Sequence, residues 1–229
     1  MKKNFVSNST ESTRMFKADW MEALSKVHWS VPLWIFVPIV TFIAWKATTV
    51  PTDIVSVIGS IVAGLVAWSL TEYVLHRFVF HFVPKSSWGL RLHFIFHGVH
   101  HDYPNDTNRL VLPPSVSLPL ATGIYFLYKS FIPEQYLYPF FAAFLVGYLC
   151  YDISHYALHH AKFENALWKK LKHHHMTHHY QNPEKGYGVT SKLWDIIVRS
   201  DFEAPSRNTP ASEQKTEVRS QQGEAFNTY

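Results

Sequence analysis

Four long apolar stretches that contain no charged residue alternate with polar segments along the chain. They cover residues 27–45, 54–71, 110–128 and 135–151. Each approaches the roughly 20 apolar residues that an α-helix needs to cross the hydrocarbon core of a bilayer. A single stretch of this kind could be a buried helix of a soluble protein, but four in 229 residues are too many for one soluble core. The pattern therefore predicts an all-α integral membrane protein with four transmembrane helices.

The segments between these stretches predict how the helices are paired and oriented. Residues 46–53 and 129–134 are short links, so the four helices are expected to form two hairpins. Lysine and arginine gather before the first helix, between the second and third, and after the fourth, whereas the short links carry only Lys46 and Lys129. By the positive-inside rule, the segments rich in basic residues lie in the cytoplasm.

Composition divides the chain into one membrane domain and two polar ends. Residues 27–200 form the domain, preceded by a polar N-terminal segment, residues 1–26, and followed by a polar tail, residues 201–229. The tail and most of the N-terminal segment lack apolar periodicity and are expected to be largely disordered. The net charge of +4 lies mainly on the cytoplasmic rim, where anionic lipid head groups are a sufficient partner. Nothing in the sequence indicates binding of nucleic acid.

Histidine supplies the candidate chemistry of this chain. It occupies 15 positions, and all but His28 fall between residues 76 and 179, on the predicted cytoplasmic side. Neutral imidazole is the commonest metal ligand among side chains, and residues three and four apart share one face of a helix. Each of two HxxHH sets is therefore expected to direct three imidazoles to one point. Ten candidates are too many for one ion, so we expect two ions with four or five imidazoles each. The candidate ligands are His76, His81, His97, His100, His101, His155, His159, His175, His178 and His179.

The other histidines, namely His93, His160, His173 and His174 together with His28, are expected to be hydrogen-bonded surface or interface residues.

Two acids near the histidine clusters are candidate catalytic residues. Asp152 precedes His155 by three positions, and Glu72 precedes His76 by four, so each acid shares a helix face with a candidate ligand. An acid at the end of a membrane span is costly unless it is paired. We therefore expect Asp152 and Glu72 to accept hydrogen bonds that orient liganding imidazoles. The alternative for both is an interfacial acid in contact with water.

The donor set alone does not select the metal. Cys150 is the only cysteine, which excludes an internal disulfide and a cysteine-based zinc motif. We expect it to be buried as a small apolar residue in the fourth span. Imidazole suits zinc, copper, iron and nickel alike. A metal pair at the boundary of bilayer and cytosol is accessible to a lipid chain and to a soluble electron donor, which favours oxidation of acyl chains.

Two other classes of protein also carry histidine clusters. A zinc transporter needs polar ligands near the bilayer midplane, and the charge-free spans place none there. A metal buffer is better served by irregular histidine-rich loops than by repeated helical spacings. A hydrolase that uses zinc-activated water stays open as a third alternative.

The histidine spacings resemble those of the fatty acid hydroxylase superfamily of membrane di-iron oxygenases. Its pattern of HxxxxH, HxxHH, HxxxH and a final HxxHH is met in full by the ten candidate ligands. Residues 98–114, GVHHDYPNDTNRLVLPP, and residues 178–194, HHYQNPEKGYGVTSKLW, are similar to the fatty acid 2-hydroxylases that act on sphingolipid acyl chains. They are less similar to the sterol and carotenoid hydroxylases and desaturases of the same superfamily, which stay as the alternative. The resemblance extends over residues 27–200.

This resemblance implies four transmembrane helices capped by a cytoplasmic helical domain that holds two iron ions. The implied reaction is an O2-dependent hydroxylation at C2 of a lipid acyl chain, on ceramide or a related amide-linked lipid. Zinc can fill the same all-imidazole site in a purified sample. Such an enzyme resides in a bacterial inner membrane or in the endoplasmic reticulum. Candidates for head-group or entrance contacts are Arg109, Tyr180, Thr190 and Trp194, with ordinary interfacial packing or lipid anchoring as an equal alternative for each.

The resemblance also implies a source of electrons. Relatives often carry an N-terminal cytochrome b-type haem domain, and the segment before residue 27 is too short for one. The expected donor therefore acts in trans, as a cytochrome b-type protein or a ferredoxin with its reductase.

Overall fold

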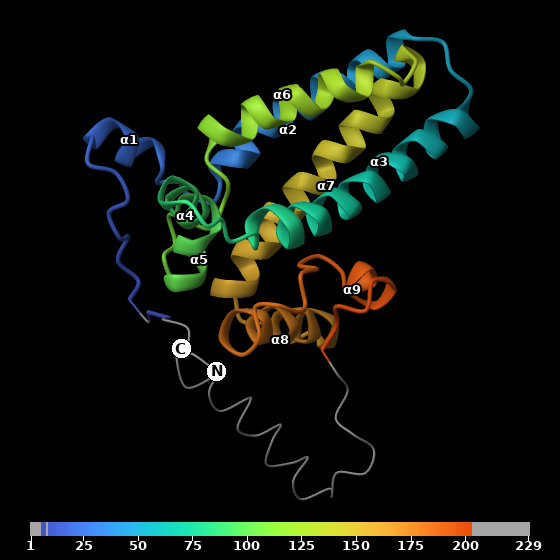
Figure 1. Ribbon diagram of the computed structural model, residues 1–229. Helices are drawn as coiled ribbons and strands as arrows, with labels where there is room; N and C mark the ends of the chain where they lie inside the picture. Colours follow the sequence, from blue (N-terminus) through green and yellow to red (C-terminus); the bar gives the residue numbers. More distant parts are fainter. Residues whose placement is uncertain (1–5, 8, 203–229) are drawn as a thin grey trace, which may run out of the picture.

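The structure is a computed structural model that describes residues 6, 7 and 9–202, and these residues form helices and loops without a β-strand. Four longer helices form a bundle, and the shorter helices gather at one end of it (Figure 1). The bundle consists of α2 (Val31–Thr49), α3 (Ile54–Val74), α6 (Pro114–Lys129) and α7 (Glu134–His160). The other elements are α1 (Asp19–Leu24), the π-helix η1 (Leu75–Phe80), α4 (Ser87–His93), the π-helix η2 (Phe94–Gly98), α5 (Val99–Asp102), α8 (Ala166–Tyr180) and α9 (Leu193–Ile197).

Three helical segments among the described residues are long and apolar enough to cross a membrane: Val31–Thr49, Ile54–Phe80 and Glu134–His160. The third predicted span is shorter than expected, because residues 110–113 precede the helix and α6 starts only at Pro114. Its 16 residues extend about 24 Å at 1.5 Å per residue, which is less than the roughly 30 Å of a hydrocarbon core.

Helix α7 forms the centre of the bundle. It packs mainly against α3 and α2, and its aromatic and leucine side chains make up most of the buried apolar core. Helices α3 and α7 approach closely at two glycines, since a Cβ atom on Gly64 would lie 2.1 Å from the Phe140 carbonyl oxygen, and one on Gly147 would lie 2.6 Å from the Trp68 ring. Small residues that allow such close approach are typical of contacts between membrane helices.

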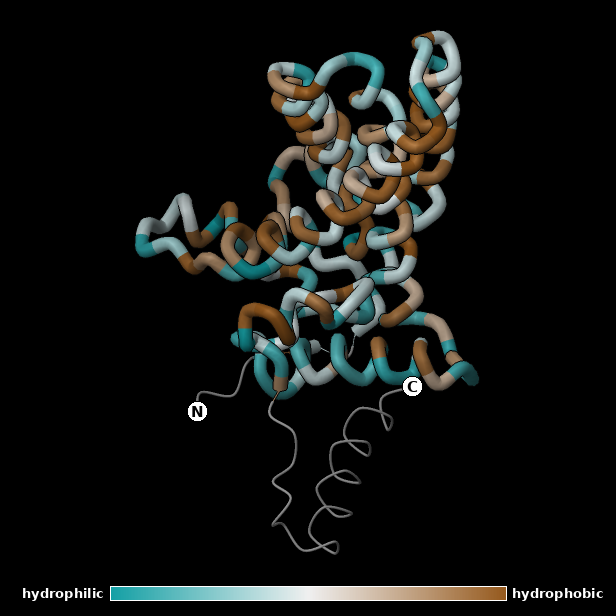
Figure 2. The backbone as a smooth tube through the Cα atoms, turned by 90° about the vertical axis from the view of Figure 1, so that its right-hand side faces the viewer, coloured by the Kyte–Doolittle hydropathy of each residue, from teal (hydrophilic) through white to brown (hydrophobic). Residues whose placement is uncertain are grey.

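Hydrophobic residues predominate along the bundle, whereas hydrophilic residues gather at the end that carries α8 (Figure 2). The outward faces of the bundle are apolar, since Trp34, Phe42, Val55 and Phe126 are each more than half exposed. Soluble proteins rarely expose large contiguous apolar surface, so these faces fit contact with lipid. Cys150 also lies exposed on α7, which corrects the expectation that it is buried. The helix surface at this position faces outward, where an apolar side chain is compatible with lipid.

The N-terminal segment packs against the domain, in contrast to the disorder expected for most of it. The Ser12 hydroxyl donates to Asp106 at 2.6 Å, and the guanidinium group of Arg91 donates to the carbonyl of Met15, which is buried. These contacts hold residues 9–25 alongside α4 and the loop that precedes α6. The polar tail after residue 202 lies outside the described residues.

Candidate metal centre

All ten predicted ligands converge at the end of the bundle where α3 and α7 terminate. Helix α7 supplies two of them from its last turns, and α8, which lies across this end, supplies three more (Figure 1). The remaining five come from η1, the residue that follows it, η2 and α5. Five helical elements are therefore needed to assemble the centre.

The π-helix η1 explains why residues five apart can act together. In an α-helix, His76 and His81 would point about 140° apart, since each residue turns the chain by about 100°. The backbone N–H of His81 instead donates to the carbonyl of His76 at 3.2 Å, which is the i to i+5 bond of a π turn. The wider turn brings both imidazoles to the same side, and their ring centroids lie 5.0 Å apart. Such π segments are frequent at functional sites.

The imidazoles form two groups of five, and within each group the possible ligand atoms all lie within 4.8 Å of one another. The first group has His97 Nε2 at its centre, 3.1 Å from His76 Nε2, 3.2 Å from His81 Nε2 and 2.9 Å from His101 Nε2. In the second group, His175 Nε2 lies 2.9 Å from His159 Nε2 and 3.1 Å from His179 Nε2. The first group is His76, His81, His97, His101 and His178, and the second is His100, His155, His159, His175 and His179.

This division corrects one expectation, because neither HxxHH set directs three imidazoles to one point. In each set the two histidines four apart stay together, as His97 with His101 and His175 with His179. The middle histidine, His100 or His178, joins the other group. It directly precedes the last histidine of its set and therefore points about 100° away from it around the helix. Each set thus serves both groups, and the stacked rings of His101 and His179, 4.2 Å apart, lie where the groups meet.

The two groups fit a pair of metal ions. Imidazole nitrogens bind ions such as zinc at about 2.0–2.1 Å, so two neighbouring ligands at right angles lie about 3 Å apart. The shortest separations between nitrogens in both groups, 2.9–3.2 Å, match this value. Five imidazoles around one ion also leave one position of an octahedron open.

Burial keeps these imidazoles neutral, which is the form that binds metal. Desolvation, reinforced by neighbouring histidines, lowers the pKa of His81 to about 2. The same two causes hold the pKa values of His97, His100, His175 and His179 well below the ordinary 6.5. A cluster of protonated imidazoles would repel both a metal cation and itself, so the buried packing favours ligation.

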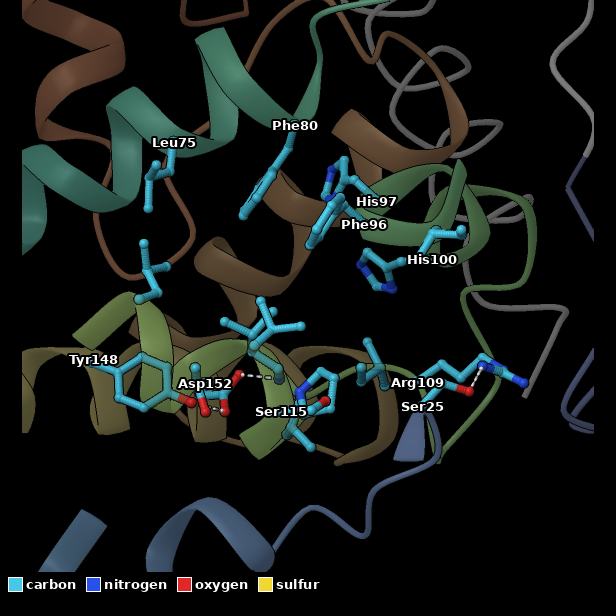
Figure 3. Close-up of a pocket in the computed structure, with 18 of the residues that line it drawn as sticks. Ser25, Leu75, Phe80, Phe96, His97, His100, Arg109, Ser115, Tyr148 and Asp152 are labelled. Carbon is cyan, nitrogen blue, oxygen red and sulfur yellow. Dashed lines mark hydrogen bonds between the residues drawn. The ribbon is translucent and has the colours of Figure 1, made fainter. Parts of the chain in front are cut away.

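An apolar cavity of about 310 Å³ reaches this centre from the bundle. His97 and His100 lie on one side of it, and Tyr148 and Asp152 lie across from them (Figure 3). Its other walls are contributed by residues of α1, α3, η1, η2, α6, α7 and the loop before α6. The cavity borders imidazoles of both groups, and its mostly apolar lining suits an apolar ligand.

Comparison with known proteins agrees with this geometry. The chain matches the family model for fatty acid hydroxylase over residues 61–200, which is more than half of its length. It belongs to the fatty acid hydroxylase family. The sequence-based resemblance is thereby confirmed, and membership makes the chain an oxygenase enzyme.

Relatives of this fatty acid hydroxylase include proteins named as 2-hydroxylases. A dihydroceramide fatty acyl 2-hydroxylase of Arabidopsis thaliana is 36% identical over 205 residues, which cover 89% of this chain and 85% of the relative. The fatty acid 2-hydroxylase of Homo sapiens is 37% identical over 83% of this chain and 57% of its own length. The solved structure of full-length scs7p, in which only the hydroxylase domain is visible, has a TM-score of 0.76 at 37% identity. That match covers 81% of this chain and 72% of the other.

The two candidate acids of this hydroxylase are buried, with Glu72 5% and Asp152 1% exposed. This excludes the alternative that they are interfacial acids in water. Neither reaches an imidazole through its hydrogen bonds in the described part of the chain. Glu72 accepts from the backbone N–H groups of Val189 and Thr190 and from the Thr190 hydroxyl. Asp152 accepts from the Leu112 N–H and the Tyr148 hydroxyl, each at 3.2 Å.

The remaining histidines lie outside both groups, as expected. His28 is exposed and lies 2.9 Å from the Ser30 hydroxyl, and His173 is exposed on α8. His174 is buried and contacts Asp195 at 3.3 Å. Among the candidates for head-group contacts, Arg109 pairs with Glu22, the Thr190 hydroxyl donates to Glu72, and the Trp194 indole N–H donates to Ser69.

Sequence reasoning missed the loop of residues 185–190, here named the carbonyl loop, and the acid that holds it. The Lys185 carbonyl lies 2.8 Å from His178 Nδ1, and the Tyr187 carbonyl lies 2.5 Å from His76 Nδ1. Asp195 of α9 accepts hydrogen bonds from the Tyr187 and Gly188 N–H groups of this loop. Burial alone would raise the pKa of Asp195, but hydrogen bonds from His174, Ser200 and the loop amides lower it. The glycines at 186 and 188 were the only available signal, and they indicated a turn without indicating its partner.

Proposed function

We propose that this enzyme hydroxylates a lipid acyl chain at C2, with an amide-linked lipid of the ceramide type as substrate. The observation that carries the proposal is the apolar cavity that ends at imidazoles of both groups. Relatives named as dihydroceramide and fatty acid 2-hydroxylases support the position of attack and the acyl substrate. The reaction is R–H + O2 + 2 electrons + 2 H⁺ → R–OH + H2O.

The proposed cofactor is a pair of iron ions, one in each group of five histidines. Iron bound there would activate O2 and supply the oxidising power that cleaves an unactivated C–H bond. Zinc also accepts imidazole and can replace iron in a purified sample. The two separate five-histidine groups support a pair of ions rather than one.

The chain's own residues position the substrate. The apolar lining excludes water and holds the acyl chain in an extended form, so that one carbon approaches the centre. Asp152 lies one helical turn from His155 and faces the same cavity (Figure 3). We assign its carboxylate to accept a hydrogen bond from the substrate beside the acyl carbonyl. An amide N–H can donate this bond, whereas an ester, a thioester or an ionised fatty acid has no donor there.

The proposed domain comprises residues 27–200, with α6 as a fourth membrane helix beside the three longer ones. Local thinning of the bilayer or a tilted neighbour can accommodate a helix of this length. The excess of lysine and arginine on the segments around the centre supports a cytoplasmic position of the metal site. We further propose that a cytochrome b-type protein, or a ferredoxin with its reductase, delivers electrons in trans.

The proposal is tested by expression in a host whose lipids are known. Mass spectrometry should detect 2-hydroxylated acyl chains with the wild type and none with His100→Ala or His178→Ala. Both variants should insert into the membrane and contain less metal. His173→Ala is the matched control, because this exposed histidine shares α8 with His178 and belongs to neither group. Full hydroxylation by either ligand variant would contradict the assignment.

A further inference from the structure

The carbonyl loop contacts two ligands of the first group that come from different elements. His76 belongs to η1 and His178 to α8, and each directs its Nδ1 atom to a carbonyl of the loop. The ring of Tyr187 also packs against three imidazoles of this group, with centroids 5.3–5.8 Å away. A carbonyl accepts only, so Nδ1 must carry the proton in both histidines. Their Nε2 lone pairs are then free to face an ion.

Asp195 fixes the position of this loop. Its carboxylate is fully buried and accepts from the N–H groups of Tyr187 at 2.9 Å and Gly188 at 2.7 Å. It also accepts from the Ser200 hydroxyl at 2.7 Å and contacts His174 Nε2 at 3.3 Å. The Gly188 N–H that Asp195 holds belongs to the same peptide unit as the Tyr187 carbonyl, which contacts His76. A displacement of this peptide therefore changes the orientation of a ligand.

The backbone leaves little freedom around this carboxylate. Gly186 adopts a φ of 72°, and its N–H donates to the Ser200 carbonyl at 2.9 Å. A Cβ atom on Gly188 would lie 2.9 Å from Asp195 Oδ2 and 2.0 Å from the Ser191 carbonyl oxygen. Glu72 holds the far end of the loop at Val189 and Thr190. Buried acids thus hold the loop at its middle and at its C-terminal end, and both of its carbonyl contacts serve the first group.

We propose that Asp195 is a positioning residue for the first metal ion, acting through the carbonyl loop on His76 and His178. The inference rests on the proposed two-ion centre. Groups that orient a ligand from behind typically change metal affinity by about 10–100-fold when they are removed. Loss of Asp195 should therefore weaken one of the two ions selectively, because the ligands of the second group do not bond to this loop.

The test is a chelator titration of the purified full-length protein loaded with cobalt(II). The wild type should hold two ions per chain. Asp195→Asn replaces one accepting oxygen with an NH2 group, which would face the N–H groups of the loop or the Ser200 hydroxyl instead of accepting from them. It should release one ion at about 10–100-fold lower chelator concentration and keep the other. The absorption spectrum of the remaining cobalt should match that of His178→Ala, which damages the first group, and differ from that of His159→Ala, which damages the second.

Two further variants separate positioning from general stability. Asp19→Asn is the control, because this acid is 92% exposed and pairs with Arg14 rather than with any residue of the carbonyl loop or its support, and its titration should equal that of the wild type. Ser200→Ala removes one hydrogen bond to Asp195 and should cause a smaller loss of the same ion. If Asp195→Asn does not fold, the chelator titration of Ser200→Ala tests the proposal in its place.

The role of Asp195 would be overturned, and the two-ion centre would stand, if Asp195→Asn bound both ions equally more weakly or neither more weakly. The same outcomes apply to Ser200→Ala if Asp195→Asn does not fold. A wild type that binds fewer than two ions would overturn the centre and this inference together. Loss of the second-group ion alone would also contradict the assignment.

Discussion

Asp152 is a buried carboxylate that faces the apolar cavity, and its two hydrogen-bond donors come from the protein's own cavity wall. Leu112 N–H and the Tyr148 hydroxyl each contact one of its oxygens. A carboxylate oxygen has room for more than one donor, so a substrate N–H can be accepted as well. An acid that orients a liganding imidazole is bonded to that imidazole, whereas Asp152, among the described residues, is not. Removal of an orienting acid weakens metal binding, whereas removal of a substrate-binding acid does not.

Asp152→Asn should lower kcat/KM for an amide-linked acyl substrate by about tenfold, with both metal ions retained. The substitution replaces one accepting oxygen with an amide donor, and a lost hydrogen bond costs roughly 0.5–1.5 kcal/mol, which corresponds to a factor of up to about ten. Turnover in lipid nanodiscs and metal analysis of the same sample provide the two measurements. Loss of an ion would assign Asp152 to the orientation of a ligand, and unchanged turnover would exclude a role in substrate binding.

Helical periodicity accounts for eight of the ten histidines that the structure brings together, because it places residues three and four apart on one face, but not for His76 and His81, which lie five apart. The same periodicity was misapplied to the HxxHH sets, since the 100° between neighbouring residues separates the middle histidine from the last one and sends the two to different groups. Asp195 was also beyond reach, because its partners are backbone amides and a histidine 21 positions earlier. Composition carries no signal for such contacts.

At the scale of elements, the contact between α3 and α7 sets the position of the centre. Helix α3 continues directly into η1, which carries His76, and α7 carries His155 in its last turns. A change in the separation of α3 and α7 would therefore move His76 relative to His155. The sequence predicted both helices from their apolar runs. It did not predict the π turn at the end of α3, because this turn exchanges i to i+4 bonds for i to i+5 bonds without a change in composition.

Gly64→Ala should destabilise the protein by about 1–3 kcal/mol, since the new Cβ atom would overlap the Phe140 carbonyl on α7. Gly59→Ala is the matched control on the same helix, because no other atom lies within 4 Å of its added Cβ. This control should be neutral or more stable by about 0.5–1 kcal/mol, as alanine is the better helix former. Thermal unfolding in detergent compares the two. Equal stabilities would show that α3 and α7 can separate freely.

The N-terminal segment is held against the cavity by Glu22 of α1. Its carboxylate accepts from the N–H groups of Met15 and Phe16 and pairs with Arg109 at 2.5 Å. Burial opposes ionisation of Glu22, but these amides together with Lys26 and Arg109 lower its pKa from 4.5 to about 2. The folded state therefore binds this proton less readily than the unfolded chain does. The stabilisation is complete above pH 4.5 and is lost as the pH falls towards 2.

Protection of the Met15 and Phe16 amides from hydrogen exchange, corrected for intrinsic rates, should accordingly decrease between pH 4.5 and 2. Glu22→Gln should have lower protection at neutral pH and a flatter profile across this range. Asp19→Asn is a suitable control, because Asp19 is 92% exposed and lies on the same short helix. A profile of Glu22→Gln that follows the wild type would mean that other contacts hold the segment.

At the scale of the whole molecule, the centre lies between an apolar and a more polar cavity. The apolar one enters from the bundle, and a second one of about 270 Å³ borders His81, His101 and His179. His97 borders both cavities. Under the proposed function, a lipid chain would reach the centre through the first cavity and an aqueous reductant through the second. This arrangement requires that the bundle is in the bilayer and that α8 is in water.

Site-specific labelling can establish that orientation. In a Cys150→Ser background, Thr49→Cys places a thiol at the C-terminal end of α2, and Lys170→Cys places one on α8, both at exposed positions. The excess of basic residues around the centre predicts that a membrane-impermeant maleimide reaches residue 170 only from the cytoplasmic side and residue 49 only from the other. Intact cells and inside-out vesicles give the two directions of access. Labelling of both thiols from one side would place both ends of α7 on the same face, and the cavity would then no longer run from the bilayer to the metal ions.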